Sequence, residues 1–405
     1  LQPYLERPEI VRRLRELCNR FSSSRATLLL SGVHVRVPAE LQAHAARLEI
    51  ALPGRKELER LVRETARELR AQRRIEVDLQ QHDIEALAAG LRGLQLAEAK
   101  RVLYRVALRD GRLSAEDLAD VREGKKQRLG ESGQLEWVDT PDEGLAAVGG
   151  LDGFKRWVER RREAFGDSAA RFGLDPPRGV LLVGVPGTGK SLACRVLAGE
   201  WQLPLLRLDA GRLYDKYVGE TEANLRRALS ACEALAPAVL WMDELEKALA
   251  SGSGAADDGL SQRVLGTLLT WMQERPEPVC VTATSNDVER LPVELLRRGR
   301  FDEVFFVDLP DPQQRGAIFA LHLAQRDRDP EQFDLERLGA AAEGFSGAEI
   351  EGVVVAALYH AFSERAALSD DLLLAEVAST RPLSVLRAPE IAALRAWGER
   401  HAVPA

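Results

Sequence analysis

The chain has little cysteine, no long apolar run and no excess of basic residues, and each shortage excludes a class of protein. Its four cysteines, at positions 18, 194, 232 and 280, show neither a CxxC pair nor the spacing of a zinc site. We therefore expect buried free thiols in a reducing compartment. No apolar stretch approaches membrane-spanning length, and no signal peptide is visible. The net charge of -7 argues against nucleic acid as a general partner.

What remains is the composition of an ordinary globular protein, with 45% hydrophobic and 29% charged residues. A length of 405 residues suggests two to three domains with sizeable cores.

The most informative stretch is the glycine-rich segment 184–191, GVPGTGKS, which lies between an apolar run and a helical pattern. In a P-loop of this kind, backbone N–H groups and the positive end of the following helix bind triphosphate, and glycines allow close approach. Lys190 is then expected to reach the β- and γ-phosphates, and Ser191 to bind Mg²⁺. The alternative is an ordinary glycine-rich turn, which the flanking strand and helix patterns disfavour.

A second apolar run, residues 238–242, ends in two acidic residues, Asp243 and Glu244. This is a Walker B pattern, one strand-helix unit after the P-loop strand. Asp243 is predicted to hold Mg²⁺, usually through water, and Glu244 to orient and deprotonate the water that attacks the γ-phosphate. The alternative is an acidic helix N-terminus, where carboxylates are favoured in any protein.

Three residues further along complete the predicted site. Asn286 follows the apolar run 279–284 and is predicted to position the attacking water, unless it only forms a turn. Arg297 and Arg300 are candidate arginine fingers, which stabilise charge in a neighbouring subunit's site and contribute roughly 10³ to 10⁵ in rate. A solvated basic surface is the alternative for this pair. Fingers that act on a neighbour require an oligomer.

The pattern of apolar runs predicts an α/β core over residues 148–311, followed by a helical lid over 312–378. The five expected strands are residues 180–183, 203–208, 238–242, 279–284 and 304–307, and a helix is expected from 152 to about 165. Runs that alternate with helical patterns indicate a parallel sheet with ligands at its carboxyl edge. A tail helix is expected within 379–405, and the polar segment 124–147 predicts an exposed linker.

Residues 1–123 are similar to the region 280–380, which indicates an internal repeat. Residues 28–32, 38–41 and 90–93 align with 282–286, 292–295 and 344–347. The first copy has Gly32 in place of Asn286 and is shortened where the arginines stand. We expect it to be half of an inactive nucleotide-binding core, with a strand near 28–31, plus a helical lid. Chance similarity of helical segments is the alternative.

The motifs GVPGTGKS, VLWMDE, TATSN and LLRRGRFD, which end at residues 191, 244, 286 and 302, resemble the AAA branch of the AAA+ ATPases over about residues 147–378. Segments 148–152, 203–209, 211–213 and 239–244 are more narrowly similar to the uncharacterised AAA family encoded in algal plastids and cyanobacteria. The common motif has Pro at the position of Arg298, which bears on the conformation of the fingers.

The resemblance implies an AAA+ P-loop domain, with a five-stranded parallel sheet of order 5-1-4-3-2, an all-helical lid and homo-oligomeric rings, expected to be hexamers. It also implies ATP with Mg²⁺, and adenine held between residues 149–150 and 347–348. The expected nucleotide-binding residues are Val148, Gly149, Gly184, Val185, Pro186, Gly187, Thr188, Gly189, Lys190, Ser191, Leu192, Gly347 and Ala348.

Tyr217 and Val218 match the aromatic-aliphatic-glycine loop that lines the pore of AAA rings and grips polypeptide. This predicts an ATPase that remodels or unfolds a protein client in the cytoplasm, or in the plastid stroma if the protein is organellar. Packing of Tyr217 at a subunit interface or on the lid is the alternative. The rival functions are an ATP-gated scaffold or switch without threading and, against the acidic balance, a DNA-linked AAA+ protein.

Overall fold

The structure is a computed structural model. Its chain divides into two compact units, residues 1–52 and residues 53–405. The residues that it describes are 5, 7–21, 24, 26–30, 37–46, 53–71, 75–114, 117, 120–121, 135–141, 144–209, 220–249, 258–275, 277–297 and 299–405.

The first unit contains helix α2 (Pro8–Phe21) and the 3-10 helix η1 (Ala39–His44). A strand was expected near residues 28–31, but residues 26–30 form neither a strand nor a helix, and Leu29 is 81% exposed. A strand needs a partner for its backbone groups, and the sheets of the described residues contain none for this segment.

Residues 53–121 form a small helical region with its own core. The helices are α3 (Arg55–Ala71), α4 (Gln81–Gly90) and α5 (Leu96–Asp110). Two short strands, β1 (Glu76–Val77) and β2 (Arg112–Leu113), pair with each other in parallel. Apolar residues of all three helices, among them Leu58, Leu87 and Leu103, are fully buried in one cluster. The described residues of this part of the chain are therefore mainly helical.

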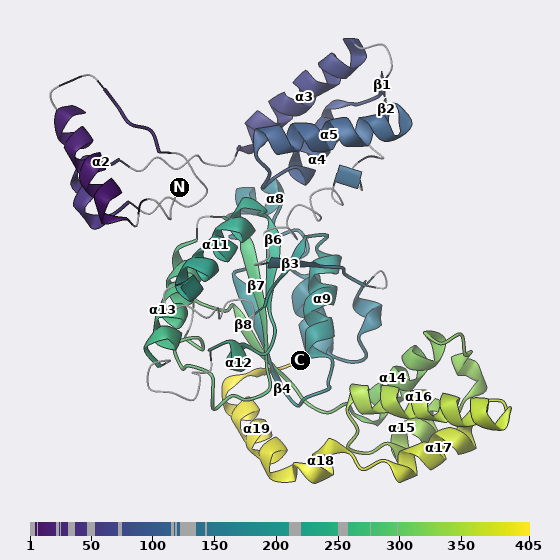
Figure 1. The fold of residues 1–405 in the computed structure, drawn as a ribbon. Helices are drawn as coiled ribbons and strands as arrows, with labels where there is room; N and C mark the ends of the chain where they lie inside the picture. The colour runs from purple at the N-terminus through teal and green to yellow at the C-terminus, as the bar shows by residue number, and fades with distance from the viewer. Residues whose placement is uncertain are drawn as a thin grey trace. The chain divides into compact units, whose positions relative to one another are not determined.

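A seven-stranded sheet forms the centre of the chain (Figure 1). Its strands are β3 (Leu135–Val138), β4 (Gly179–Gly184), β5 (Leu205–Leu208), β6 (Ala238–Met242), β7 (Val279–Ser285), β8 (Glu303–Val307) and β9 (Val403–Pro404). The order is β3-β5-β6-β7-β4-β8-β9, and the five central strands are parallel. All five strands expected from the apolar runs are present. The strand that leads into the P-loop, β4, lies between β7 and β8.

Two edge strands correct the expectation of a five-stranded sheet. Residues 135–138 fall in the segment expected to be an exposed linker, yet they pair antiparallel with β5 as β3, because Leu135 is an apolar residue that the core buries. At the other edge, β9 pairs with β8, and the N–H of Ala405 donates to the carbonyl oxygen of Phe306 at 3.1 Å. Strands β3 and β9 thus form hydrogen bonds with β5 and β8, which would otherwise be the unpaired edge strands of the sheet.

Helices cover both faces of the sheet, as Figure 1 shows for α9 on one side and α11 with α13 on the other. One core cluster joins the sheet to α11 (Glu220–Ala234) and α13 (Asp258–Glu274), and the other joins it to α7 (Asp152–Glu159) and α9 (Lys190–Glu200). The helix α7 is shorter than expected, since turns follow Glu159 before α8 (Asp167–Phe172). The short helix α12 (Leu245–Leu249) follows β6 directly.

Between β8 and β9 the chain is helical. It contains α14 (Pro312–Ala324), η4 (Pro330–Gln332), α15 (Leu335–Ala341), α16 (Gly347–Glu364) and α17 (Asp370–Ser379), and then α18 (Leu383–Leu386) and the tail helix α19 (Ala388–His401). A separate cluster that includes Phe319, Ile350 and Leu373 forms the core of the lid. Ser346 and Glu349 form a capping box that fixes the first turn of α16.

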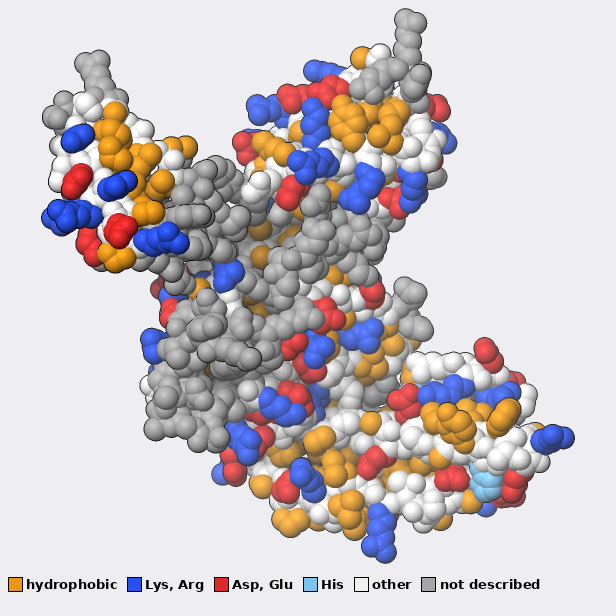
Figure 2. Space-filling model, in the orientation of Figure 1, with side chains coloured by type: hydrophobic (Ala, Val, Ile, Leu, Met, Phe, Trp, Pro, Cys, Tyr) orange, Lys and Arg blue, Asp and Glu red, His pale blue; other side chains and the backbone are white. Residues whose placement is uncertain are grey.

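No described helix is long and apolar enough to span a membrane. On the face drawn in Figure 2, basic and acidic side chains of the described residues are interspersed, with no single continuous basic area.

Candidate nucleotide-binding site

The turn between β4 and α9 has the backbone of a phosphate-binding loop. Gly187 and Gly189 have φ values of +78° and +85°, a region that favours glycine. A Cβ atom on Gly187 would lie 2.8 Å from the Ser346 hydroxyl, whereas one on Gly189 would meet nothing within 4 Å. The hydroxyl of Thr188 donates to the carbonyl oxygen of Val185 at 2.7 Å and closes the turn.

Lys190 is the first residue of α9 and is 95% buried, with an exposed fraction of 5%. Its ammonium donates to the carbonyl oxygens of Gly184 at 3.0 Å and Val185 at 2.7 Å. Burial lowers the pKa of Lys190 to about 8, and the nearby carboxylates of Glu246 and Asp243 oppose that shift. The cation is therefore held inside the loop, where a triphosphate would supply its counter-charge.

Ser191 and Asp243 meet although 52 residues separate them in the chain. The Ser191 hydroxyl donates to Oδ1 of Asp243 at 2.9 Å, and the Thr284 hydroxyl donates to the same oxygen at 2.5 Å. This set of a carboxylate and hydroxyl oxygens suits a hard cation such as Mg²⁺, which keeps several waters and needs few protein ligands. Ser191 and Asp243 therefore fit the predicted metal.

Glu244 has a left-handed backbone, with φ of +49°, which is rare for a residue other than glycine. Its N–H donates to the Thr284 hydroxyl at 3.0 Å. Its carboxylate accepts from Lys247 at 2.7 Å and from the Asn286 side-chain amide at 3.4 Å. The structure thus brings together the predicted base and the predicted water-positioning amide.

The lid contacts the P-loop directly. The N–H of Ala348, at the start of α16, donates to the carbonyl oxygen of Gly187 at 3.0 Å. Gly149 and Gly347 both lie near Ile318 of α14, since a Cβ atom on either glycine would be within 4 Å of that side chain. Val148 is buried and Leu192 packs against the same core cluster. The residues expected around adenine are therefore close to the loop, and Ile318 joins them.

Arg297 and Arg300 lie at the opposite end of β4 from the P-loop. The Asp302 carboxylate accepts from the N–H of Gly179 at 3.1 Å, which places this segment at the first residue of β4, whereas the P-loop begins at Gly184. At about 3.3 Å per strand residue, five steps separate the two by roughly 17 Å. The Arg297 side chain is exposed, and the Arg300 guanidinium donates to the carbonyl oxygen of Leu269 in α13.

Some sequence predictions lie outside the described residues. These are Tyr217, Val218 and Arg298.

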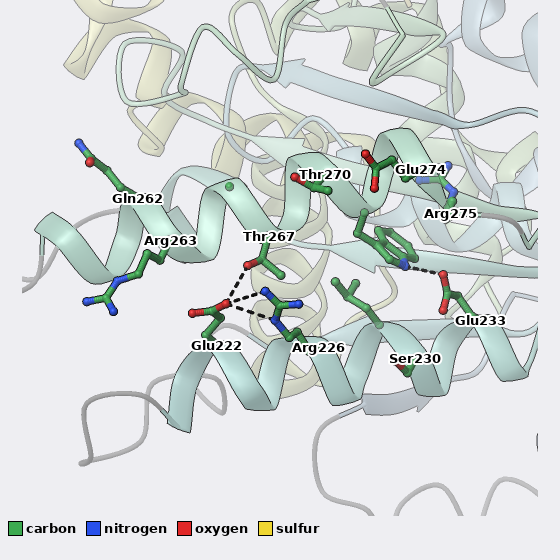
Figure 3. A pocket seen from close by; sticks show the side chains of 13 residues that line it. Glu222, Arg226, Ser230, Glu233, Gln262, Arg263, Thr267, Thr270, Glu274 and Arg275 are labelled. Atoms are coloured by element: carbon green, nitrogen blue, oxygen red, sulfur yellow. Dashed lines mark hydrogen bonds and ion pairs between the residues drawn. The ribbon is translucent and has the colours of Figure 1, made fainter. Parts of the chain in front are cut away.

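A groove of about 760 Å³ lies between α11 and α13 (Figure 3). Glu222 accepts from Arg226 of its own helix and from Thr267 across the groove, and the indole N–H of Trp271 donates to Glu233 at 2.9 Å. None of the predicted nucleotide-binding or catalytic residues lines it. The groove is therefore separate from the nucleotide site.

A P-loop at the carboxyl end of β4, a Walker B pair at the end of β6, two places away in the sheet, and a helical lid define an AAA-type ATPase domain. Family models agree with this class. Residues 180–309 match the ATPase family associated with various cellular activities, 332–372 match the AAA+ lid domain, and 56–132 match the second domain of SpoVK-like AAA ATPases.

Relatives extend the match to nearly the whole chain. The chain is 34% identical to the uncharacterized AAA domain-containing protein ycf46 of Trieres chinensis, over 96% of this chain and 77% of that protein. It is 35% identical to the ycf46 protein of Guillardia theta, over 97% and 77%. The chain belongs to this ycf46 family of AAA proteins. It is also 35% identical to the proteasome-activating nucleotidase of Aeropyrum pernix, over half of each chain.

Four further residues contact the site and were not predicted: Thr284, Glu246, Lys247 and Ile318. Thr284 and Glu246 make contacts between segments that are about 40 residues apart in the chain, and the local motifs do not show those contacts. Lys247 follows the Walker B acids by a single helical turn and could have been found from that spacing.

Proposed function

We propose that this protein is a Mg²⁺-dependent ATP hydrolase that assembles into a ring, expected to be a hexamer, and remodels or unfolds a protein client through a central pore. The observation that carries the proposal is the convergence of Ser191, Asp243, Thr284, Glu244 and Asn286 beside the P-loop. In this proposal residues 148–311 are the ATPase core, 312–378 its lid and 1–123 an inactive AAA-like region, in a reducing compartment that is the cytoplasm or a plastid stroma.

The geometry supports a role for each residue in this proposal. Residues 184–192 hold the phosphates with Lys190 as the counter-cation, and Ser191 and Asp243 hold Mg²⁺, which would neutralise charge on the phosphates. Glu244 accepts the proton of the attacking water, and the Asn286 amide, which already bonds to Glu244, aligns that water. Val148, Gly149, Gly347 and Ala348 surround adenine together with Ile318.

The fingers act on a neighbouring copy. Because the Arg297 segment lies roughly 17 Å from the P-loop of its own chain, measured along β4, it cannot contact phosphate there without unfolding the strand. A head-to-tail arrangement puts one copy's fingers at the next copy's phosphates, and such contacts close into rings when the rotation permits. This supports the homo-oligomer.

The client function is supported by the sequence of residues 216–219 and by similarity. Tyr217 and Val218 have the aromatic-aliphatic pattern of a pore loop. The chain is similar to the proteasome-activating nucleotidase and, at 32% identity over 53% of this chain, to the cell division cycle protein 48 homolog of Archaeoglobus fulgidus.

An ATP-gated scaffold or switch is the second candidate. The match of residues 56–132 to an AAA second domain supports it, since an inactive domain kept beside an active one offers a docking surface. The helices α3, α4 and α5 follow each other as α14, α15 and α16 do, which supports a duplicated lid. A DNA-linked function has no comparable support.

The test is the solution mass of the chain with ADP, with a non-hydrolysable ATP analogue, and with ATP in the Glu244→Gln variant. We expect a nucleotide-dependent change from monomer to a closed ring. A chain that binds ATP and stays monomeric would contradict the ring. Tyr217→Ala then separates the two candidates. Threading of a tagged unfolded client requires the aromatic side chain of Tyr217 and should be lost, whereas a switch should keep its nucleotide-dependent assembly unchanged.

A further inference from the structure

Glu246 is a buried carboxylate beside the nucleotide site that the roles above do not use. It lies in the first turn of α12, two residues after Glu244, and only 3% of it is exposed. Burying a carboxylate is expensive unless other groups compensate it. The contacts of the Glu246 carboxylate should therefore show what compensates its burial.

One oxygen of Glu246 has a partner in the next strand. Its Oε1 accepts from the backbone N–H of Asn286 at 3.1 Å, just beyond the end of β7. Its Oε2 is buried and has no hydrogen-bond partner among the described residues. Among the described residues, the Glu246 side chain therefore accepts its hydrogen bond from the residue predicted to align water.

Both glutamates form hydrogen bonds with Asn286, one with its backbone and one with its side chain. Glu246 binds its backbone N–H, and Glu244 accepts from its side-chain amide at 3.4 Å. The backbone of Glu244 is in turn tied to Thr284 of the same strand, at 3.0 Å. These bonds join the loop after β6 to the end of β7 and fix the distance between the base and the amide.

We infer that Glu246 is a positioning residue for hydrolysis: by holding the backbone of Asn286 it keeps the water-aligning amide against Glu244. This inference rests on the proposed ATPase function. The positioning effect requires an oxygen at this place that accepts the Asn286 N–H.

The acceptor and the charge can be separated by two substitutions of similar size. Glu246→Gln keeps an oxygen at the same position and removes the charge, whereas Glu246→Leu removes both. Glu233→Leu is the matched control, because it also removes a hydrogen bond that a glutamate accepts, here from Trp271 and away from the site. For each protein, kcat and the Kd for ATP are measured separately.

We expect Glu246→Gln to keep kcat within about threefold of the wild type, and Glu246→Leu to lose at least about tenfold in kcat, the scale of one lost hydrogen bond, with an unchanged Kd. A tenfold loss in Glu246→Gln would overturn the inference by assigning the role to charge. Equal kcat in Glu246→Leu and wild type would also overturn it. If Glu246→Leu does not fold, Glu246→Met, which also lacks an oxygen acceptor, is measured in its place. Absence of ATPase activity in the wild type would instead contradict the proposed function.

Discussion

The hydroxyl of Ser191 donates to Oδ1 of Asp243 at 2.9 Å and so connects the first turn of α9 to the end of β6. The strands that lead into these two residues, β4 and β6, are not neighbours, because β7 lies between them. Thr284 on β7 bridges this gap by donating to the same Asp243 oxygen. The pair predicted to bind Mg²⁺ is thus organised by the strand order as well as by the motifs.

Glu244→Gln should bind ATP and hydrolyse it slowly. An amide cannot take the proton of the attacking water, so we expect phosphate release to fall by about 10² to 10⁴. Phosphate release and fluorescent-nucleotide binding measure the two properties. Glu233→Gln, a glutamate of α11 outside the site, is the control and should keep full activity. Normal turnover in Glu244→Gln would rule out its assigned role.

Removal of Mg²⁺ by a chelator should abolish hydrolysis, and Asp243→Asn should raise the Mg²⁺ concentration needed for half-maximal activity. We expect a shift of about 10- to 100-fold, the range seen when a group that supports a metal is altered. Asp287→Asn, which changes a surface ion pair with Arg290, is the control. An unchanged Mg²⁺ requirement in Asp243→Asn would contradict the site.

Gly149→Ala should weaken ATP binding, because the added Cβ would lie 2.7 Å from a side-chain carbon of Ile318 and push the lid from the core. Overpacking of this kind costs about 1 to 3 kcal/mol, and a tenfold rise in Kd corresponds to about 1.4 kcal/mol. Gly266→Ala in α13, where a Cβ meets nothing within 4 Å, is the matched control. If both variants bind ATP equally, the lid contact is not part of the site.

Three of the four cysteines should resist alkylation in the folded chain. Cys194, Cys232 and Cys280 are fully buried, and burial raises the pKa of the Cys194 thiol to about 12 and raises those of the other two. Only the thiolate reacts, so at pH 8 we expect iodoacetamide to modify Cys18 at least about 100-fold faster. Mass spectrometry of labelled peptides measures this, with Cys18→Ser as the control. Rapid modification of Cys194 would contradict the packing of α9.

The same thiols make stability depend on pH. Their folded-state pKa values lie above the unfolded value of about 8.5, so the folded state binds more protons in alkaline solution. The free energy of unfolding should therefore fall as pH rises above 8.5. A denaturant titration at pH 8 and pH 10 measures the difference, which should shrink in Cys194→Ala.

Local motifs predicted much of the site, because phosphate binding depends on a short continuous segment. Residues 184–191 and the acids at 243 and 244 needed only their flanking strand and helix patterns. All five central strands followed from apolar runs. Glu246 and Thr284 could not be predicted, since their contacts with Asn286 and Asp243 depend on which strands are neighbours.

The edges of the sheet were harder to predict than its centre. Strand β3 has four residues inside a polar segment, and its pairing with β5 depends on the open edge that it covers. Strand β9 has only two residues, too few for a periodic pattern. In the first unit, the apolar residues at 28 and 29 resembled a strand but are exposed in the structure.

The most direct test of the account mixes two variants that are each inactive. Glu244→Gln lacks the base and keeps the finger, whereas Arg297→Ala lacks the finger and keeps the base. Arg297 is the cleaner choice because Arg300 also bonds to Leu269 within its own chain.

In randomly mixed rings about one quarter of the sites would pair an intact base with an intact finger from the next copy. We predict that the mixture regains up to about one quarter of wild-type ATPase activity. Co-assembly is checked by cross-linking tagged copies. Mixed rings that form and remain inactive would contradict a site completed by a neighbouring copy.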